Sequence, residues 1–267
     1  MKPDYVHGYS AKENQRLQDQ ASTLTDLLHA DSLFPPGSRI LEAGCGVGSQ
    51  TLTLAQQNPG VSFTSVDVSE LSLEQARRRI QAAGLNNVQF QQADIFRLPF
   101  DPESFDHVFV CFVLEHLPDP VAAIIALQKM LKSGGTMTLI EGDHGSAYFH
   151  PDSEAAHQAI QCQIRLQAGI GGNALIGREL YPLLRKSGFK DIRVSPRMVY
   201  VDANKPELVD GFIRKTFTAM IEGVRQKALE AKMIDAATFD QGIRDLFRTA
   251  DLPGTFCYTF FKAVGVK

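Results

Sequence analysis

The sequence lacks an excess of positive charge. Its 267 residues include 27 Lys and Arg against 30 Asp and Glu, which gives a formal net charge of −3 at pH 7. Proteins that bind nucleic acids usually carry a basic patch or stripe, so we expect no nucleic-acid partner. The composition, 44% hydrophobic and 21% charged, is otherwise that of an ordinary globular chain.

Cysteine is scarce, and long apolar runs are absent. The four cysteines form no CxxC pair or Cys/His cluster: Cys45, Cys111, Cys162 and Cys257. This spacing argues against a zinc site or a redox pair, so we expect no metal and a reducing environment. The N-terminus has no apolar stretch of signal-peptide length, and no window approaches a membrane span. The expectation is a cytoplasmic protein without membrane insertion.

Strand-like and helical patterns alternate between residues 39 and 141. Apolar runs at 39–42, 62–67, 88–94, 107–114 and 136–141 are separated by helical patterns at 50–57, 70–83 and 121–131. Asp119 and Pro120 are a typical start for the last of these helices, since Asp caps and Pro fits the first turn. Alternation at this spacing predicts βαβ units around a parallel sheet.

The regular alternation of strand-like and helical patterns ends after residue 141. The pattern there predicts a turn-rich stretch at 143–150, a helix at 152–168, a helix–strand pair at 180–187 and 190–194, helical stretches at 205–231 and 236–250, and a strand at 255–264. We therefore predict an α/β fold, a doubly wound seven-stranded and mostly parallel sheet with the last strand antiparallel, plus a helical lid insertion. The predicted boundaries are an N-terminal helical cap at 1–36, an α/β core at 37–200, the lid at 201–252 and the returning strand at 253–267.

A glycine-rich turn joins the first predicted strand to the first core helix. It reads Ile-Leu-Glu-Ala-Gly-Cys-Gly-Val-Gly over residues 40–48. Glycines let a ligand approach the backbone closely, and the following helix presents unpaired N–H groups. Dinucleotide-binding proteins use a similar turn, but their fingerprint places glycine where Ser49 stands. Glu42 before the turn would repel a pyrophosphate and can accept hydrogen bonds from an ammonium.

Two further acidic residues close the next predicted strands. Asp67 lies about twenty residues after the glycine turn, the spacing that places a carboxylate on a ribose diol. Asp94 closes the third strand, where it can accept from an adenine amino group. Each residue alone is more often a helix cap or a solvated charge. Together with Glu42 they predict a nucleoside site, because ligands of open α/β sheets bind at the carboxyl ends of the strands.

At this point the chain resembles the class I S-adenosylmethionine-dependent methyltransferases, especially their ubiquinone/menaquinone-type small-molecule branch. The motifs that carry the resemblance are those at 41–48, 66–67, 93–94, 105–106, 114–117 and 131–135, with a later helix–strand pair at 180–194. Ser133 departs from the family, which usually has proline there. The resemblance implies S-adenosylmethionine as cofactor and a small-molecule methyl acceptor.

The resemblance also assigns roles to particular residues. It places Glu42 and the glycine loop on the methionine part of the cofactor, Asp67 on the ribose, Asp94 and Ile95 on the adenine, and Cys111 with Phe112 beside the sulfonium. The expected cofactor-binding set is Tyr9, Glu42, Gly44, Cys45, Gly46, Gly48, Asp67, Val68, Asp94, Ile95, Cys111, Phe112 and His116. His116 is expected to have a structural or cofactor-covering role, and Tyr9 to close over the cofactor from the N-terminal segment.

Candidates for the acceptor side follow the fifth strand. His144 could take a proton from the acceptor, with Asp143 nearby to raise its basicity. The alternative is a surface turn in which Asp143 caps and His144 is solvated. Tyr148, Phe149 and His150 are expected either to form an aromatic wall for the substrate or to belong to the core. Most apolar lid residues belong to the core, and the surplus would face a hydrophobic acceptor or the second subunit of a homodimer.

Two other classes of protein share part of this pattern. A nicotinamide-dependent oxidoreductase explains the βαβ alternation, but not Glu42, Ser49 or the segment at 131–135. A cofactor-binding protein without catalysis would carry identical motifs, and only turnover separates it from an enzyme. Enzymes that methylate nucleobase amines carry an Asn/Asp-Pro-Pro-aromatic motif after the fourth strand, where this chain has Cys-Phe-Val-Leu at 111–114. The sequence leaves open whether O, N or C is methylated.

Overall fold

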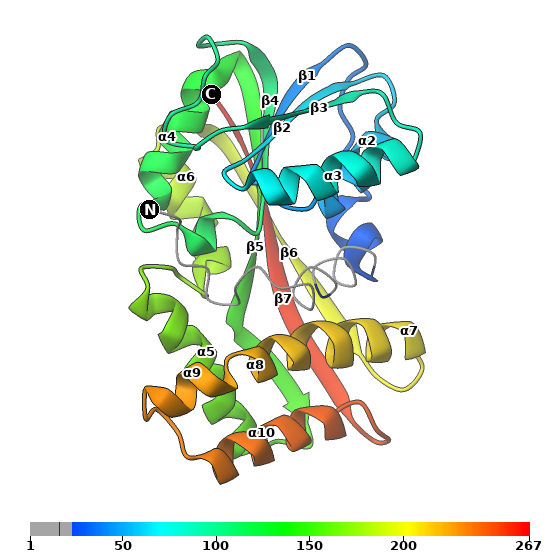
Figure 1. The fold of residues 1–267 in the computed structure, drawn as a ribbon, viewed down its shortest axis with the longest axis vertical. Coiled ribbons are helices and arrows are strands. Elements are labelled where there is room, and N and C mark those ends of the chain that lie inside the picture. The colour runs from blue at the N-terminus through cyan, green and yellow to red at the C-terminus, as the bar shows by residue number, and fades with distance from the viewer. Residues whose placement is uncertain (1–15, 17–22) are drawn as a thin grey trace. The chain divides into compact units, whose positions relative to one another are not determined.

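The computed structural model describes Arg16 and residues 23–267 of the chain (Figure 1). Residues 23–29 are helical, which agrees with the end of the helix expected ahead of the core. Tyr9 and most of that helix lie outside the described residues. Within the described part of the chain, no helix is both long and apolar enough to cross a membrane.

The centre of the fold is a seven-stranded sheet with the order β3-β2-β1-β4-β5-β7-β6. The strands are β1 (Arg39–Ala43), β2 (Ser62–Asp67), β3 (Val88–Gln92), β4 (Phe105–Cys111), β5 (Leu131–His150), β6 (Lys190–Val201) and β7 (Thr255–Val266). β1 pairs in parallel with β2 and β4, β2 with β3, and β4 with β5. The predicted class of fold is therefore confirmed, with β1 at the point where the strand order reverses.

The last strand runs against β5, as predicted. The N–H of Lys267 donates to the carbonyl of Gly135 at 2.9 Å, near the start of β5. Further along β5, the Ser146 hydroxyl accepts from the N–H of Thr259 at 2.9 Å. The partner numbers in β7 fall as those in β5 rise, which is the mark of an antiparallel pair.

Helices of the core cover both faces of these strands. They are α2 (Ser49–Gln57), α3 (Glu70–Ala82), η1 (Leu114–His116), α4 (Pro120–Met130), η2 (Ile176–Glu179) and α6 (Leu180–Lys186). The carboxylate of Asp119 accepts the N–H of Ala122 at 2.9 Å, which confirms the predicted cap of α4. Figure 1 shows α4 beside α6 and α2 beside α3.

One continuous apolar cluster joins the strands to α4 and α6. Alternate strand residues face it, and the following buried side chains belong to it: Leu41, Ala43, Val108, Val110, Leu139, Ile124, Leu127, Leu180 and Leu184. Burying a side chain of this size contributes about 1.5–3 kcal/mol. Because successive strand residues point to opposite faces, Glu42 between Leu41 and Ala43 faces the α2 side.

The described chain forms two compact units. We call Thr25–Glu141, Ile176–Arg197 and Phe261–Lys267 the core unit. The second, or helical, unit holds Gly142–Leu175, Met198–Phe260 and the described residues up to Leu24. Its helices are α5 (Glu154–Gly169), α7 (Pro206–Leu208), the π-helix η3 (Val209–Thr218), α8 (Ala219–Gly223), α9 (Arg225–Glu230) and α10 (Ala236–Arg248). Strands β5, β6 and β7 contribute residues to both units.

The prediction of a turn at 143–150 is wrong, because β5 continues as a strand to His150. Glycine, aspartate and serine favour turns locally, but pairing with β7 and burial override that preference. Glycine fits at position 142 because it has no side chain. A Cβ on Gly142 would lie 2.4 Å from the Tyr258 hydroxyl, which is too close. Several smaller boundaries differ from expectation. β3 ends at Gln92, β4 spans Phe105–Cys111 instead of 107–114, β5 begins at Leu131 instead of residue 136, and β6 extends to Val201. The helical stretch at 205–231 is divided among α7, η3, α8 and α9.

Aromatic side chains form the core of the helical unit. Phe212 packs against Phe217, with ring centroids 6.4 Å apart, and against Tyr258 at 5.8 Å. Phe217 and Phe256 are 4.8 Å apart. All of these rings are at most 2% exposed. The phenylalanines expected in the lid are therefore partly used for internal packing, as helical spacing indicated.

Candidate active site

The glycine loop after β1 lies at the carboxyl edge of the core sheet. Gly44, Gly46 and Gly48 all have left-handed backbone, with φ of 75°, 52° and 74°. The N–H groups of Gly44 and Cys45 donate to the carbonyl of Val66 at 2.8 and 3.0 Å, which fastens the loop to the end of β2. α2 begins directly after it, at Ser49, so the N-terminus of a helix follows the loop.

Glu42 is buried beneath this loop, with 2% of its surface exposed. Its Oε2 accepts hydrogen bonds from the hydroxyl of Thr51 at 2.7 Å and the hydroxyl of Ser65 at 2.6 Å. Burial raises the pKa of Glu42 to about 7, although the two hydroxyl donors oppose the shift. Both donors are neutral, so this carboxyl would gain from a cationic ligand group.

Asp67, at the end of β2, is bound to the same loop. Its Oδ2 accepts the N–H of Gly46 at 2.8 Å, and its Oδ1 accepts the N–H of Ser69 at 2.9 Å. Burial raises the pKa of Asp67, against the effect of these N–H groups. Each carboxylate oxygen has a second acceptor site. Asp67 can therefore hold the loop and still accept from a ligand hydroxyl.

The segment after β4 approaches the glycine loop from the neighbouring strand. Phe112 has left-handed backbone, with φ 57°, which is unusual for a bulky residue. Its N–H donates to the carbonyl of Ile140 at 2.9 Å. Burial raises the pKa of the Cys111 thiol well above its usual value, so this cysteine stays protonated. Sparsely populated backbone of this kind is found most often at functional sites.

The remaining predicted cofactor residues occupy nearby positions with different exposure. Asp94 lies two residues beyond β3, and its Oδ1 accepts the N–H of Phe96 at 2.9 Å. Ile95 belongs to the apolar cluster of the core unit, and Val68 after β2 is 43% exposed. His116 lies in η1, with Nε2 3.6 Å from the Glu115 carboxylate.

The geometry of this edge suits a cationic nucleoside cofactor. Among the residues that the structure describes, Glu42 and Asp67 accept only from hydroxyl and backbone N–H donors, and burial raises the pKa of both. A ligand ammonium would favour the ionised form of Glu42, whereas a pyrophosphate would meet the two acids Glu42 and Asp67. The loop glycines leave its surface free of large side chains. Fold and site together define an α/β protein that binds S-adenosylmethionine rather than a dinucleotide.

The predicted proton acceptor lies in the helical unit, in β5. His144 is 7% exposed, and its Nδ1 lies 2.8 Å from the hydroxyl of Tyr258. Its backbone N–H donates to the carbonyl of Ala174 at 2.9 Å. Asp143 is 3% exposed, and its Oδ1 accepts the N–H of Gly145 at 3.0 Å. The two residues are therefore buried in a strand, and the solvated-turn alternative does not hold.

The three aromatic candidates that follow have different surroundings. The Phe149 ring stacks on His157 of α5, with centroids 4.8 Å apart, and on Phe256 at 5.9 Å. Tyr148 is 68% exposed, and His150 ends β5 on the surface. Phe149 thus packs within the helical unit, while Tyr148 and His150 are accessible.

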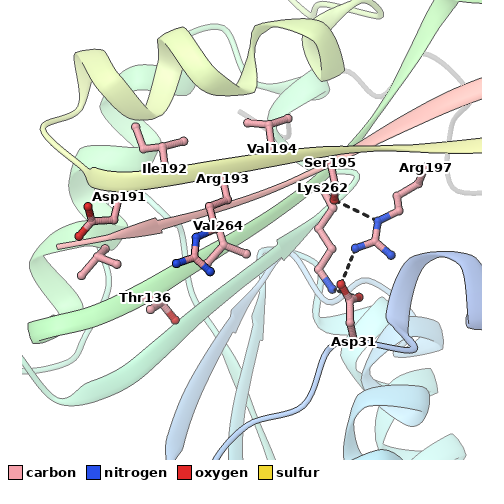
Figure 2. A pocket seen from close by; sticks show the side chains of 11 residues that line it. Asp31, Thr136, Asp191, Ile192, Arg193, Val194, Ser195, Arg197, Lys262 and Val264 are labelled. Carbon is pink, nitrogen blue, oxygen red and sulfur yellow. Dashed lines mark hydrogen bonds and ion pairs between the residues drawn. The ribbon is translucent and has the colours of Figure 1, made fainter.

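A cavity of about 790 Å³ lies in the core unit, over β5, β6 and β7 (Figure 2). Lys262 lies at one end and is 4% exposed, with Nζ 2.6 Å from the Asp31 carboxylate and 2.8 Å from the Ser32 hydroxyl. Asp31 also pairs with Arg197. The cavity shares no residue with the predicted site. The ion pairs at this end hold the segment that follows the N-terminal helix to β7 and β6.

Comparison with known proteins identifies the family. A family model described as a methyltransferase domain matches residues 35–188. A 27-O-demethylrifamycin SV methyltransferase of Amycolatopsis mediterranei is 30% identical over 239 residues, 88% of this chain and 80% of that protein. A demethylmenaquinone methyltransferase of Staphylococcus aureus is 33% identical over 106 residues, 39% of this chain and 43% of that protein.

A solved structure gives the same result for the fold. Phosphoethanolamine N-methyltransferase 2 of Haemonchus contortus, in complex with phosphomonomethylethanolamine and S-adenosylhomocysteine, has a TM-score of 0.57 at 19% identity. The match covers 95% of this chain and 53% of that one. The chain belongs to the methyltransferase-domain family, and it is a class I S-adenosylmethionine-dependent methyltransferase of the small-molecule type. The resemblance expected from the motifs is confirmed.

Sequence reasoning missed four residues that shape the site. Ser65 and Thr51 hold Glu42, Tyr258 contacts His144, and Glu141 lies buried at the carboxyl end of the core part of β5. Glu141 carries a signal that could have been used, since it is a charged residue directly after the apolar pair Leu139 and Ile140. Tyr258 has none, because its contact depends on pairing across more than a hundred residues.

Proposed function

We propose that the protein methylates an apolar small molecule, with Glu42 and Asp67 as the main holders of the cofactor. The observation that carries the proposal is that these two carboxyl groups flank one glycine loop and, within the described residues, accept hydrogen bonds from neutral donors only. Glu42 would accept from the ammonium of the methionine part, and Asp67 from the ribose hydroxyls. Asp94 and Ile95 would contact the adenine, and Cys111 with Phe112 the sulfonium side.

The remaining cofactor contacts are proposed on position alone. Val68 follows Asp67, His116 follows the turn after β4, and Tyr9 lies outside the described residues. Bound S-adenosylmethionine supplies an activated methyl group on sulfur. The chain's own task is then to orient the acceptor, exclude water and accept a proton where the acceptor carries one.

We propose that His144 takes this proton, as a buried histidine of β5 whose Nδ1 lies 2.8 Å from the Tyr258 hydroxyl. A neutral imidazole can take a proton near pH 7. Asp143 is proposed to support the basicity of His144 through its negative charge. Tyr148 and His150 are proposed as substrate contacts because they are exposed, and Phe149 as their packing support.

The acceptor is proposed to be a hydroxylated ring compound such as a naphthoquinol or a polyketide. One relative is named a 27-O-demethylrifamycin SV methyltransferase and another a demethylmenaquinone methyltransferase, and we take our proposal from these names. The helical unit also presents exposed apolar side chains beyond its packed core, among them Met198, Tyr200, Met233, Phe247 and Leu252. Such surface suits an apolar acceptor, or a second subunit in a homodimer. We propose residues 201–252 as the lid over it.

Four free cysteines support a reducing, cytoplasmic location. Two are half-buried and none is paired, as expected of a protein that meets no oxidising compartment. The homodimer and the cytoplasmic location would be checked by light scattering and by fractionation of cells that express the tagged protein.

The decisive experiment is an assay with methyl-labelled S-adenosylmethionine and a panel of naphthoquinols, polyketide alcohols and amines. Mass spectrometry should find one added methyl group on a ring hydroxyl or ring carbon, with one S-adenosylhomocysteine formed per product. Products found only among amines would contradict the proposed acceptor class. Calorimetry gives the cofactor control: we expect heat from S-adenosylmethionine and S-adenosylhomocysteine and none from NAD. Tight NAD binding alone would contradict the assignment of Glu42 and Asp67.

A further inference from the structure

Glu141 is a completely buried carboxyl group with 0% of its surface exposed. It ends the part of β5 that belongs to the core unit. Its Oε1 accepts two backbone hydrogen bonds, from the N–H of Val113 at 3.0 Å and from that of Leu114 at 2.8 Å. Both donors belong to the turn that follows β4, where Phe112 takes its left-handed conformation.

The same turn touches the glycine loop. The Val113 side chain lies so close to Gly44 that a Cβ on Gly44 would be 2.4 Å from Val113 Cγ2. Gly44 in turn donates to the carbonyl of Val66 at the end of β2. A series of direct contacts therefore leads from Glu141 through Val113 to the loop. The position of the loop depends on the position of Val113.

We propose that Glu141 is a positioning residue of the cofactor site: it fixes the turn at 112–114 so that Val113 holds the glycine loop in its binding conformation. The inference rests on the proposed function only in taking this loop as the cofactor loop. Two neighbouring N–H groups in a buried turn need an acceptor. Glu141 supplies one from the adjacent strand, and the left-handed residue before them is kept in place by the same bonds.

The contacts use one oxygen of the carboxyl group. Oε2 is buried and has no hydrogen-bond partner in the part of the chain that the structure describes. Burial, and then repulsion from Glu115, raise the pKa of Glu141 well above its usual value, so the neutral acid is favoured. A neutral amide offers the same acceptor at the same distance from the backbone. Glutamine should therefore replace Glu141 in this role, whereas methionine keeps the length and removes the acceptor.

The test compares Glu141→Gln with Glu141→Met in the full chain. A matched control is Asn58→Ala, because Asn58 is also buried and holds backbone groups, the Leu54 and Ser32 carbonyls and the Phe34 N–H, away from the loop. Calorimetry with S-adenosylhomocysteine should show at least a tenfold rise in Kd for Glu141→Met and less than a threefold rise for Glu141→Gln. Asn58→Ala should lower Tm and leave Kd unchanged.

Amide hydrogen exchange provides a readout that needs no cofactor. Exchange at Val113 and Leu114 should quicken in Glu141→Met and remain slow in the wild type and in Glu141→Gln. Unchanged exchange in Glu141→Met, or equal rises in Kd for the Met, Gln and Asn58 variants, would overturn the proposal. If the wild type binds neither sulfur nucleoside, the proposed function fails, and the exchange result still decides the role of Glu141 in holding the turn.

Discussion

The hydroxyl of Tyr258 lies 2.8 Å from Nδ1 of His144, and the two residues are 114 positions apart in the sequence. This contact is compatible with two tautomers of His144, and general-base chemistry at Nε2 requires one of them. If Nε2 is to accept a proton, Nδ1 must carry hydrogen and donate to the tyrosine oxygen. If the tyrosine instead donates to Nδ1, Nε2 already carries hydrogen and cannot act as a base.

Replacing His144 with Ala should lower kcat by roughly 10²–10⁴-fold, the usual contribution of a general base, with the Kd of S-adenosylhomocysteine unchanged. Tyr258→Phe should cause a smaller fall. The control is His157→Ala, because His157 is another histidine of the helical unit but is 43% exposed at its side chain and pairs with Asp152. Nitrogen NMR of His144 would identify the tautomer. Full activity of His144→Ala at every pH would mean that catalysis depends on positioning alone.

Replacing Asp67 with Ala should raise the Kd of S-adenosylmethionine tenfold or more. Two ribose hydroxyls would lose a charged acceptor, a loss of roughly 1.5–3 kcal/mol, and the N–H of Gly46 would lose its partner. Asp119→Ala serves as the control, since Asp119 is an acid that caps α4 through the N–H of Ala122. That variant should lose about 1 kcal/mol of stability and keep its Kd. Equal Kd values for Asp67→Ala and the wild type would place the ribose elsewhere.

The core of the fold could be predicted because its signals are local. Apolar runs, glycines at turns and helix ends, and the cap at Asp119 each depend on a few adjacent residues. Together they predict β1 to β4 and their helices. The three acidic residues at successive strand ends could be found for the same reason. Glu42 and Asp67 then lie on either side of one glycine loop, because parallel strands bring their carboxyl ends to one edge of the sheet.

Where contacts are distant in sequence, prediction failed. The stretch 143–150 has the composition of a turn, yet Ser146 and His144 pair with Thr259 and Tyr258 of the last strand and stay extended. No local pattern reveals those partners. The role inferred for Glu141 was hidden similarly, because it depends on N–H groups of a turn 27 and 28 positions earlier.

Replacing Glu42 with Gln should stabilise the free protein at pH 8 while weakening cofactor binding. The pKa of Glu42 is raised from 4.5 to about 7 on folding. Between those values the folded state keeps a proton that the unfolded state has released, so this group's contribution to stability falls as pH rises. Glutamine cannot ionise, so the variant avoids this loss of folding stability, which is at most about 3 kcal/mol. It also lacks the negative charge that would hold the ammonium of the cofactor.

Urea unfolding at pH 5 and pH 8 would measure this effect. The stability difference between Glu42→Gln and the wild type should be small at pH 5 and larger at pH 8. Burial lowers the pKa of His29 to about 4, so His29 titrates in an overlapping range but is present in both proteins and cancels. A difference that does not grow with pH would mean that Glu42 is ionised at ordinary pH in the free protein.

The ion pair between Lys262 and Asp31 should be asymmetric in its effect on stability. The Lys262 side chain is 4% exposed and that of Asp31 is 53% exposed. Removing Lys262 leaves a hydrated carboxylate that still pairs with Arg197. Removing Asp31 leaves a buried ammonium whose other contacts, the Ser32 hydroxyl and the Leu28 carbonyl, are neutral. An uncompensated buried charge costs far more than a broken exposed pair.

We therefore expect Asp31→Ala to lower the free energy of unfolding by about 3 kcal/mol and Lys262→Met by about 1 kcal/mol or less. Burial lowers the pKa of Lys262, a shift that Asp31 opposes, so without Asp31 the ammonium loses its proton at lower pH. The unfolded state then binds more protons than the folded one, and the cost of Asp31→Ala should shrink as pH rises towards 10. The double variant should match Lys262→Met, since no buried charge remains. Urea unfolding of the three variants at pH 7 and pH 9.5 tests this order, and equal losses for both single variants would show that Lys262 is solvated.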